Sequence, residues 1–368
     1  MLDLAAQDAM VGARVRAAVE EVARSQCFIL GGVVERFESA AAAYLDVAHA
    51  IGTSSGSDAL VCALLALEIG PGDEVITTPF SFFATAESIL RVGARPRFVD
   101  IRAANFDLDS EQVDAAINSR TRAILAVHLY GHPAAVDRLR QISEARGLPL
   151  VEDAAQAFGA RLHGKRVGTF GALGCFSFHP AKPLGAWGDA GMVVTNDARL
   201  AERCRRLRVH GAARKHLHDL VGGNFRLDAL QAAVLLAKLE MVDDWLAARA
   251  AHAEAYTEAV RESASVVPPA SAAGADPSWA LYTLRAGRGQ RDVLARHLTE
   301  RQIQTAVHYP LPLYRQPALA ACVHSKALPE AERAAREVLS LPLYPELTSA
   351  MRQRVTDAVL EFRPQPTS

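Results

Sequence analysis

The chain has 368 residues, of which 50% are apolar, and it carries 40 Lys plus Arg against 41 Asp plus Glu. The resulting net charge of -1 argues against a protein that binds nucleic acid or an anionic membrane through bulk charge. No stretch approaches the ~18–20 apolar residues of a membrane span, and the first residues lack the pattern of a secretory signal, so we expect a soluble cytoplasmic protein of roughly two domains.

Short apolar runs bounded by Gly, Pro or Asp alternate with helical patterns through the first two thirds of the chain. The runs predict buried strands at residues 74–78, 97–99, 123–127, 148–152 and 192–195. The intervening patterns predict helices at residues 57–67, 84–92, 110–117 and 136–145. This alternation of strand and helix predicts an α/β fold with a mostly parallel sheet covered on both faces.

The last third of the chain has a different pattern. A helical pattern runs from residue 227 to about 262, and a segment rich in Pro, Ala, Ser and Gly follows at 266–277. Beyond it, one strand and two helices are predicted, at 281–285, 290–302 and 330–339. We therefore expect a large domain over residues 1–245 and a smaller α+β domain over residues 246–368.

A turn rich in Gly and Ser, from Gly52 to Ser57, opens the first predicted helix. Free N–H groups at a helix start, nearby hydroxyls and the helix dipole together form an anion site. The alternative is an ordinary helix cap, because Ser before a helix is common and Asp58 suits the dipole. The segment matches neither G-x-x-x-x-G-K-[ST] nor G-x-G-x-x-G, so a P-loop or dinucleotide site is not expected.

The apolar run at 148–152 ends in Glu152, and Asp153 follows it. In α/β sheets, ligands gather at the carboxyl ends of the strands. A partly buried Asp keeps its charge there only beside a cation, and a protonated pyridine nitrogen would suit. Asp153 is equally well explained as the cap of the next helix.

Only five of the 40 basic residues are lysines, which leaves few candidates for amine chemistry. Lys182 stands in an apolar, Gly-rich stretch after the strand-like GCFSF at 174–178. Such surroundings disfavour the ammonium and lower its pKa, as a Schiff-base lysine requires. A solvated side chain is the alternative for Lys182, and it is what we expect of the other four: Lys165, Lys215, Lys238 and Lys326.

Twelve histidines and five cysteines raise the question of a metal site. The cysteines are widely spaced and form no C-x-x-C pair, so neither a zinc knuckle nor a disulfide framework is expected. His216 and His218 form the only tight histidine pair, and no H-E-x-x-H motif occurs. We therefore expect no metal ion.

Taken together, these segments resemble the DegT/StrS family of pyridoxal-phosphate (PLP) nucleotide-sugar aminotransferases. The likeness extends over nearly the whole chain and includes residues 31–38, 70–75, 79–85, 223–228 and 305–310. It implies an aspartate-aminotransferase-like fold (type I), in which a large domain with an N-terminal helical arm and a mostly parallel seven-stranded sheet precedes a smaller C-terminal α+β domain. It also implies a homodimer with active sites at the subunit interface.

The resemblance assigns residues to the cofactor. Lys182 would form the Schiff base and then move a proton between donor and cofactor. Asp153 would pair with the ring nitrogen, Gln156 would bond the ring's 3-oxygen, and the Phe82 ring would stack on the cofactor. The phosphate would be held by Gly56, Ser57, Ser177 and Asn224 of the partner subunit. The structural alternatives are a core position for Phe82, a strand end for Ser177 and a turn for Asn224.

Three further residues would approach the substrate. Arg226 would hold an anionic group of the donor or acceptor. His308 and Tyr309 match a family segment that approaches the sugar, and we expect them to come from the partner chain; an ordinary loop position is the alternative for His308. The polar stretch at 208–219 is expected to be a mobile loop near the sugar nucleotide.

The implied reaction transfers an amino group from glutamate to a keto-sugar nucleotide. Residues 179–191 and 305–319 look most like members that act on UDP-2-acetamido-2-deoxy-3-keto-glucuronate, in bacterial surface-polysaccharide (lipopolysaccharide O-antigen) biosynthesis. The alternative acceptor is a dTDP-linked 3- or 4-keto-6-deoxyhexose. Two other classes stay open, a PLP-dependent sugar dehydratase, which carries His where Lys182 stands, and a non-catalytic regulator; intact Lys182, Asp153 and Gln156 argue against them.

Overall fold

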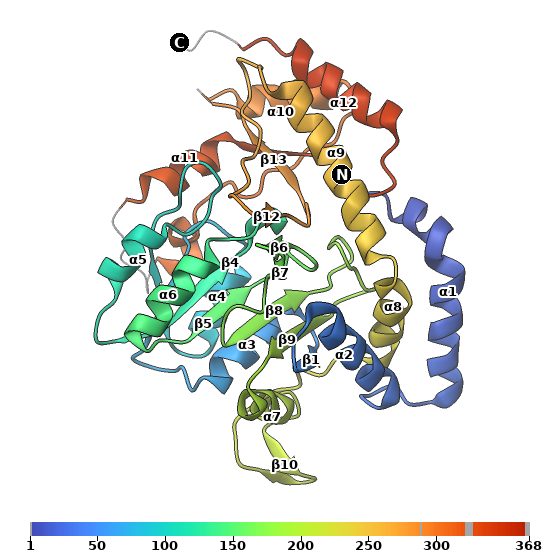
Figure 1. Ribbon diagram of the computed structural model, residues 1–368, viewed down its shortest axis with the longest axis vertical. Coiled ribbons are helices and arrows are strands. Elements are labelled where there is room, and N and C mark those ends of the chain that lie inside the picture. The colour runs from blue at the N-terminus through green and yellow to red at the C-terminus, as the bar shows by residue number, and fades with distance from the viewer. Residues whose placement is uncertain (1, 288, 321–326, 365–368) are drawn as a thin grey trace.

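The computed structural model describes residues 2–287, 289–320 and 327–364, and a seven-stranded sheet lies at its centre (Figure 1). Lys326 lies outside these residues. The strand order is β1 (His49–Thr53), β9 (Gly191–Thr195), β8 (Leu173–Ser177), β5 (Leu150–Asp153), β4 (Thr121–Val127), β2 (Glu74–Thr77) and β3 (Arg95–Phe98). Strand β9 is antiparallel to both neighbours and the other pairs are parallel, so the expected mostly parallel sheet is confirmed.

Helices cover both faces of this sheet. In β4, Ile124 packs into the core under α2, α5, α6 and α8, whereas the next residue, Leu125, packs into the core under α3, α4 and α7. Burial on both faces explains why the strands are continuous apolar runs in the sequence. The helices are α2 (Gly32–Leu45), α3 (Gly56–Ala66), α4 (Ala84–Arg91), α5 (Ser110–Ala116), α6 (Val136–Arg146), α7 (Ala198–Leu207) and α8 (Ala229–Leu239).

Another core lies in the C-terminal part of the chain, above the sheet in Figure 1. Two antiparallel strands pair at its centre, with Tyr282 opposite Leu341. Tyr256, Leu294 and Val359 contribute to this core from three helices. The elements of this part are α9 (Val242–Val260), β13 (Tyr282–Arg285), α10 (Arg291–Glu300), α11 (Pro329–Glu337), β14 (Val338–Leu341) and α12 (Ser349–Glu361).

Three predictions in this part were wrong in detail. The helical pattern from 227 to 262 forms two helices, α8 and α9, because the chain turns at Glu240 and Met241. The helix predicted at 330–339 ends at Glu337, since its last two positions begin the fully buried strand β14. The predicted loop at 266–277 contains a short strand. The boundary after residue 245 stays a prediction, and it falls within α9.

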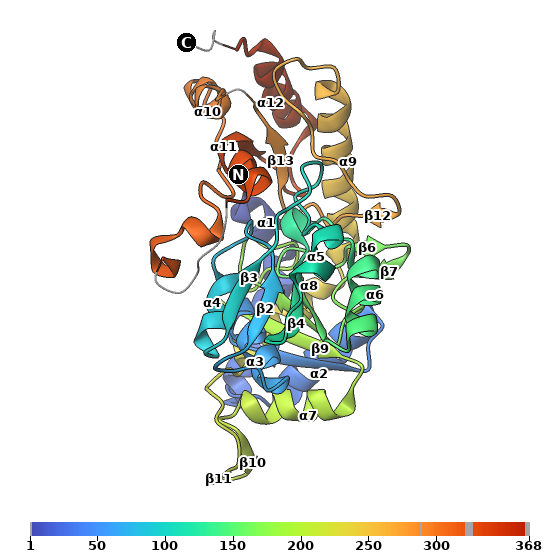
Figure 2. The ribbon, with the colours of Figure 1, turned by 90° about the vertical axis from the view of Figure 1, so that its left-hand side faces the viewer.

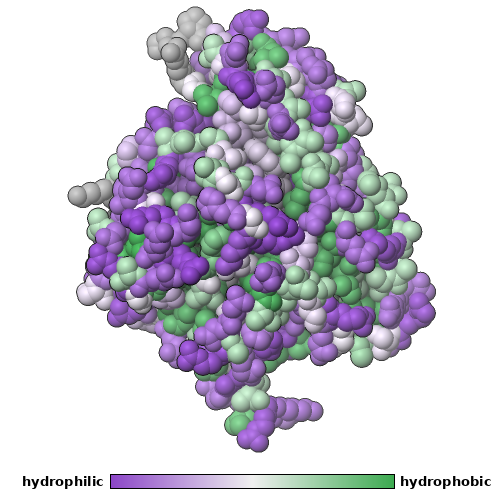
Figure 3. All heavy atoms as spheres, viewed as in Figure 1, coloured by the Kyte–Doolittle hydropathy of each residue, from purple (hydrophilic) through white to green (hydrophobic). Residues whose placement is uncertain are grey.

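The short strand of that loop, β12 (Ala275–Asp276), completes a small sheet with β6 (Arg161–Leu162) and β7 (Lys165–Arg166). The stretch expected as a loop at 208–219 contains a hairpin of β10 (Ala212–Arg214) and β11 (Leu217–His218). Figure 2 shows this hairpin protruding below α7, and its side chains are mainly hydrophilic (Figure 3). The described residues also form the 3-10 helices η1 (Leu129–Gly131), η2 (Leu313–Arg315) and η3 (Pro317–Leu319).

The first helix, α1 (Leu4–Ser25), lies along α8 at the edge of the molecule (Figure 1). Val11 and Val15 of α1 form a small core with Val234 and Trp245. The expected N-terminal helical arm is thus packed on the helix that follows the sheet. Within the described residues, none of the helices, α1 included, combines the length and the apolar character needed to cross a membrane.

Candidate active site

A cavity of about 480 Å³ opens at the carboxyl ends of β4, β5 and β8. Parallel strands end at one edge of a sheet, and α/β folds bind their ligands there. Its wall includes most of the residues selected from the sequence, namely Gly56, Ser57, Phe82, Asp153, Gln156, Ser177, Lys182, His308 and Tyr309. These residues lie far apart in the chain, so it is the sheet topology that brings them together.

Lys182 lies on the loop that follows β8. Its backbone N–H donates to the carbonyl of His179 at 2.8 Å, which turns the chain so that the side chain lines the cavity. Desolvation by the cavity wall lowers the pKa of Lys182 from 10.5 to about 8, although the negative charge of Asp153 opposes this shift. At neutral pH a larger fraction of this amine is therefore nucleophilic than in a solvated lysine.

Asp153 ends β5 and is buried, with 5% of its surface exposed. Its Oδ2 accepts a hydrogen bond from Thr85 Oγ1 (2.8 Å), and its Oδ1 accepts one from the backbone N–H of Ala155 (3.2 Å). Burial raises the pKa of Asp153, whereas these hydrogen bonds and the charge of Lys182 lower it. The residues after Asp153 form turns, so Asp153 does not cap a helix. Its carboxylate is suited to a cationic ligand atom.

A buried polar pair lies beside Asp153 and was missed in the sequence. His128 Nε2 lies 2.9 Å from Glu152 Oε2, and both side chains are fully buried. The N–H of Ala134 donates to His128 Nδ1, which places the ring proton on Nε2, so that His128 donates to Glu152. Glu152 also accepts three backbone N–H bonds of 2.7 Å. The one signal of this pair in the sequence was Glu152 itself, which lies next to Asp153 at the end of a strand.

The start of α3 forms another wall of the cavity. The N–H of Asp58 donates to Ser55 Oγ at 3.1 Å, so the helix cap proposed as an alternative exists. The cap does not exclude an anion site, because Ser57 and Ser177 line the cavity beside the positive end of the helix. A Cβ atom on Gly56 would lie only 2.6 Å from Ser177 Cβ, so glycine is needed for this approach of α3 to β8.

The side-chain amide of Gln156 is held at both ends. Its Oε1 accepts from the backbone N–H of Tyr130 (2.5 Å), and its Nε2 donates to the Tyr309 hydroxyl (3.2 Å). Burial raises the pKa of Tyr309, so this hydroxyl stays neutral. The Phe82 ring lies 6.1 Å from the Tyr309 ring and is 59% exposed. Phe82 is therefore not a core residue, and its face can stack on a planar ligand.

His308 and Tyr309 line the cavity of their own chain, which corrects the expectation that they approach from the partner. His308 Nδ1 lies 2.9 Å from Ser340 Oγ, and the Tyr130 hydroxyl donates to the His308 carbonyl. Burial, and to a smaller extent the charge of Lys182, lowers the pKa of His308. This imidazole is therefore neutral at pH 7, which suits a hydrogen bond to an uncharged substrate group.

Asn224 and Arg226 do not line this cavity. Asn224 is exposed and forms an isolated β-bridge with Val209. Arg226 is half-buried beside Thr53, and its buried Nε has no hydrogen-bond partner. The roles assigned to both residues stay predictions.

Lys238 is not solvated, contrary to the prediction. The residue is 2% exposed, and its Nζ donates to the Gly185 carbonyl (2.8 Å) and to Gln7 Oε1 (2.9 Å). Burial lowers the pKa of Lys238 to about 8. Its partners lie 53 and 231 residues away in the sequence, so its helical surroundings gave no signal of this position. Lys165 and Lys215 are exposed as predicted.

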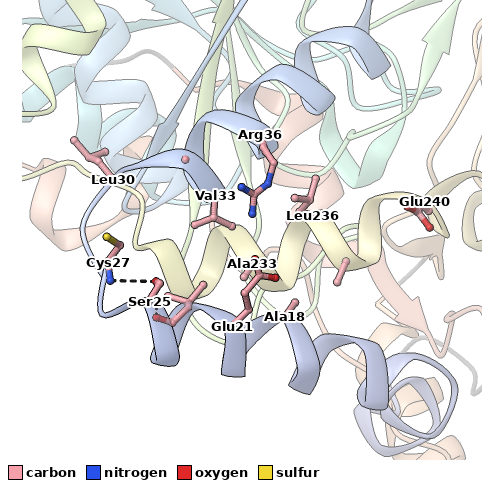
Figure 4. Close-up of a pocket in the computed structure, with 13 residues that line it drawn as sticks. Ala18, Glu21, Ser25, Cys27, Leu30, Val33, Arg36, Ala233, Leu236 and Glu240 are labelled. Carbon is pink, nitrogen blue, oxygen red and sulfur yellow. Dashed lines mark hydrogen bonds between the residues drawn. The ribbon is translucent and has the colours of Figure 1, made fainter.

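A second cavity, of about 410 Å³, lies between α1, α2 and α8 (Figure 4). Apolar side chains such as Val33 and Leu236 line it, and the N–H of Cys27 donates to Ser25 Oγ at its rim. None of the residues selected from the sequence lies there. In the part of the chain that the structure describes, no three His, Cys, Asp or Glu side chains are grouped so that they could hold a metal ion.

Residues 10–360 match the DegT/DnrJ/EryC1/StrS aminotransferase family. The chain is 47% identical to a protein of Geobacillus stearothermophilus named pleiotropic regulatory protein, and the match covers 98% of each chain. It is 44% identical to the dTDP-3-amino-3,4,6-trideoxy-alpha-D-glucose transaminase of Streptomyces venezuelae, over 98% of this chain and 95% of that protein.

Two further similarities are to an aminotransferase and to a solved structure. The chain is 40% identical to the UDP-2-acetamido-2-deoxy-3-oxo-D-glucuronate aminotransferase of Pseudomonas aeruginosa, over 95% of this chain and 96% of that protein. Its fold matches the crystal structure of S. venezuelae DesV in complex with a ketimine intermediate, with a TM-score of 0.95 and 44% identity over 98% of this chain and 96% of that chain.

Proposed function

Because the chain belongs to the DegT/DnrJ/EryC1/StrS aminotransferase family and is an enzyme that transfers amino groups, we propose that it moves an amino group from glutamate to the 3-keto group of a sugar nucleotide. One observation carries this proposal. An amine of lowered pKa, a buried carboxylate and an anion cradle share the walls of one cavity, at Lys182, Asp153 and Gly56–Ser57. Two relatives are named for 3-amino or 3-oxo sugars, which supports amination at carbon 3.

We infer that PLP, on which enzymes of this family depend, is the cofactor of this chain, and the residues present fit it. Gly56 allows α3 to approach β8 closely, and the hydroxyls of Ser57 and Ser177 in the cavity wall there suit a phosphate. Asp153 is buried with a hydroxyl and an N–H as its hydrogen-bond donors, so its charge suits a protonated ring nitrogen. When bound, PLP supplies an electron-accepting ring and carries the amino group between the two substrates.

The protein side chains have distinct tasks in this proposal. Lys182 attaches the cofactor through Nζ, and a pKa of about 8 lets the same atom accept and return a proton near neutral pH. Asp153 keeps the ring nitrogen protonated. Gln156, fixed at both ends of its amide, orients the ring through its 3-oxygen, and Phe82 covers one ring face.

We further propose a homodimer with shared active sites. Several large apolar side chains are exposed among the described residues, as is common at interfaces, and they include Ile29 (55%), Phe82 (59%), Trp187 (44%) and Val221 (91%). Asn224 would then reach the phosphate in the partner's cavity, and Arg226 would hold an anionic substrate group. Sedimentation at micromolar concentration tests the dimer, and Asn224→Ala mixed with Lys182→Ala tests sharing, because a mixed dimer would regain one complete site.

Two acceptors are candidates. The UDP-linked 2-acetamido-3-keto-glucuronate is supported by the P. aeruginosa relative, and its product would serve bacterial surface-polysaccharide (lipopolysaccharide O-antigen) synthesis. A dTDP-linked 3-keto-6-deoxyhexose is supported by the S. venezuelae relative, whose identity to this chain is slightly higher. The two candidates differ in nucleotide base and in a carboxylate at carbon 6, so a direct assay separates them.

The test is a coupled assay with the purified enzyme, PLP, glutamate and each keto-sugar nucleotide. We expect formation of 2-oxoglutarate together with a sugar aminated at carbon 3, identified by mass and NMR. Turnover of only dTDP-linked 6-deoxy sugars would exclude the uronate. If no donor and acceptor pair gives an aminated sugar while PLP is bound, the proposal fails.

A regulatory role is the second candidate, because the relative from G. stearothermophilus is named as a regulatory protein. A regulator that keeps the fold without catalysis would bind PLP but give no change of cofactor absorbance with glutamate. The intact set of Lys182, Asp153 and Gln156 in one cavity favours the enzyme. It also argues against a dehydratase, which carries His in place of the lysine.

A further inference from the structure

The loop that carries Lys182, residues 179–188, is held from outside by helix α8. Gln231 accepts the N–H of Trp187 with Oε1 (2.9 Å) and donates to the carbonyl of the same residue with Nε2 (3.3 Å). Lys238 donates to the carbonyl of Gly185 at 2.8 Å. Gln231 and Lys238 are seven residues apart, which places them on one face of a helix. One helix face therefore fixes the loop at two points just after Lys182.

The loop itself is tightly folded, so its parts move together. The N–H of Ala186 donates to the Phe178 carbonyl at 2.8 Å and closes the turn around Lys182. A Cβ on Gly185 would lie 2.5 Å from the Pro180 carbonyl oxygen, so the two sides of the loop are in contact. A bond to Gly185, three residues after Lys182, therefore restrains the backbone from which the Lys182 side chain extends.

Lys238 is a costly residue for this position. The surrounding residues of α8 are mainly apolar and buried, and Lys238 is 2% exposed among them. Burying an ammonium costs free energy unless hydrogen bonds replace its water. A leucine or methionine would fill the same volume without that cost. We therefore attribute the presence of a lysine at this position to the hydrogen bonds that its ammonium donates to Gly185 and Gln7.

The second partner of Lys238 extends the restraint to the N-terminal helix. Gln7 of α1 is 7% exposed, and its Oε1 accepts from Lys238 Nζ at 2.9 Å. A cavity of about 250 Å³ separates this part of α1 from the loop, with Asp8, Pro180 and Trp187 in its wall. Lys238 lies in the wall of this cavity and bonds to both sides of it, so it bridges α1 and the loop.

We propose that Lys238 is a positioning residue for amino transfer, which fixes the loop of Lys182 through the Gly185 carbonyl and couples that loop to helix α1 through Gln7. The inference rests on the proposed function, in which Lys182 is the amine that attaches the cofactor. Lys238 touches neither cofactor nor substrate in this scheme and acts only through the loop.

The test removes the ammonium while filling its volume, with Lys238→Met. In cofactor-free protein, we expect amide hydrogen exchange across residues 178–190 to rise at least about tenfold, the lower limit for the loss of one hydrogen bond to a charged group. The rate at which Lys182 captures PLP, followed by borohydride trapping and peptide mapping, should fall by a similar factor. In the holoenzyme kcat should fall while the KM values for donor and acceptor stay nearly constant.

Two variants separate positioning from general destabilisation. Leu236→Ala removes apolar packing of α8 in the wall of the second cavity (Figure 4) without a bond to the loop, so it should lower the melting temperature but leave loop exchange and capture rate unchanged. Gln7→Leu should give a smaller effect than Lys238→Met, and no additional effect when combined with it. Where Lys238→Met does not fold, Lys238→Gln, which is too short to reach Gly185, takes its place.

Wild-type loop exchange and capture rate in Lys238→Met or Lys238→Gln would overturn the proposal. So would an equal loss in Leu236→Ala, because the effect would then follow stability alone. A failure of the proposed function is distinguishable, since the wild-type protein itself would then neither attach PLP at Lys182 nor transfer an amino group.

Discussion

Thr85 donates a 2.8 Å hydrogen bond from its hydroxyl to Oδ2 of Asp153 inside the cavity. The Oγ1 of Thr85 lies 2.9 Å from Ser81 Oγ. Because the proton of Thr85 is directed to the carboxylate, Ser81 is the donor in the second bond. Burial favours the protonated form of Asp153, and the bond from Thr85 opposes that shift. These two hydroxyls therefore help to keep Asp153 charged and fixed in direction.

Thr85→Val removes this donor at nearly constant volume. Oδ2 of Asp153 then loses its hydroxyl partner, so the pKa of Asp153 rises further and its pairing with a ring cation weakens. Hydrogen bonds to charged groups contribute about 1.5–3 kcal/mol, so we expect at least about a tenfold loss in kcat/KM and in PLP affinity. Titration of PLP and steady-state kinetics check this. Thr85→Ser keeps the hydroxyl and should retain most activity; equal losses in both variants would contradict the argument.

The lowered pKa of Lys182 predicts a pH dependence of cofactor capture. In cofactor-free protein, half of the Lys182 amines are neutral near pH 8, because burial depresses the pKa from 10.5. The rate of attachment of PLP should therefore rise with pH through a midpoint near pH 8 and level off above it. Stopped-flow absorbance measures this rate, and Lys182→Ala, which offers no amine there, is the control. A midpoint near that of a free lysine would show that the cavity does not desolvate the amine.

The same depressed pKa has a consequence for stability. Between pH 8 and 10.5 the unfolded chain binds a proton at residue 182 that the folded protein does not, so the free energy of unfolding rises with pH in this window. Lys182→Met removes this contribution. The difference in melting temperature between wild type and Lys182→Met, both without cofactor, should shift in favour of wild type as the pH rises from 8 to 10. No change in that difference would contradict a depressed pKa in the folded state.

The parallel strands could be predicted because burial on both faces demands continuous apolar runs. Strand β1 (His49–Thr53) could not be predicted in this way. Its sequence, HAIGT, contains His and Gly, and the strand lies at the edge of the sheet. Strand β14 was hidden for another reason. It follows α11 without Gly or Pro between them, so Val338 and Leu339 read as the last turn of the helix.

The candidate site divides in a similar way. Lys182 and Asp153 stood out because their neighbours in the sequence are also their neighbours in the cavity. Thr85, His128 and Lys238 bond to partners 68, 24 and 53 residues away, and only the folded chain brings those partners together. The local sequence therefore revealed residues that line the cavity and not the groups that hold them in place.

Loss of one or of both hydrogen bonds of Gln156 should weaken PLP binding to different degrees. Tyr309→Phe removes only the hydroxyl that accepts from Nε2, and the Tyr130 N–H still holds Oε1. A neutral hydrogen bond contributes about 1 kcal/mol, so PLP affinity should fall only severalfold. Gln156→Leu leaves both the Tyr130 N–H and the Tyr309 hydroxyl unpaired and should cost more in affinity and in melting temperature. Equal affinities in the two variants would show that the amide does not orient the cofactor.

Gly56→Ala tests the cradle between α3 and β8. The new methyl group would lie 2.6 Å from Ser177 Cβ and 3.1 Å from Ser177 Oγ, so Ser177 must move away from the cavity wall. Overpacking of this kind costs about 1–3 kcal/mol, and we expect PLP affinity to fall by about tenfold or more. Ser57→Ala, which removes a hydroxyl and adds no atoms, should have a smaller effect. The decisive comparison is with pyridoxal, which lacks the phosphate. Gly56→Ala should bind pyridoxal as tightly as the wild type does. An equal loss of affinity for PLP and for pyridoxal would show that the phosphate binds elsewhere.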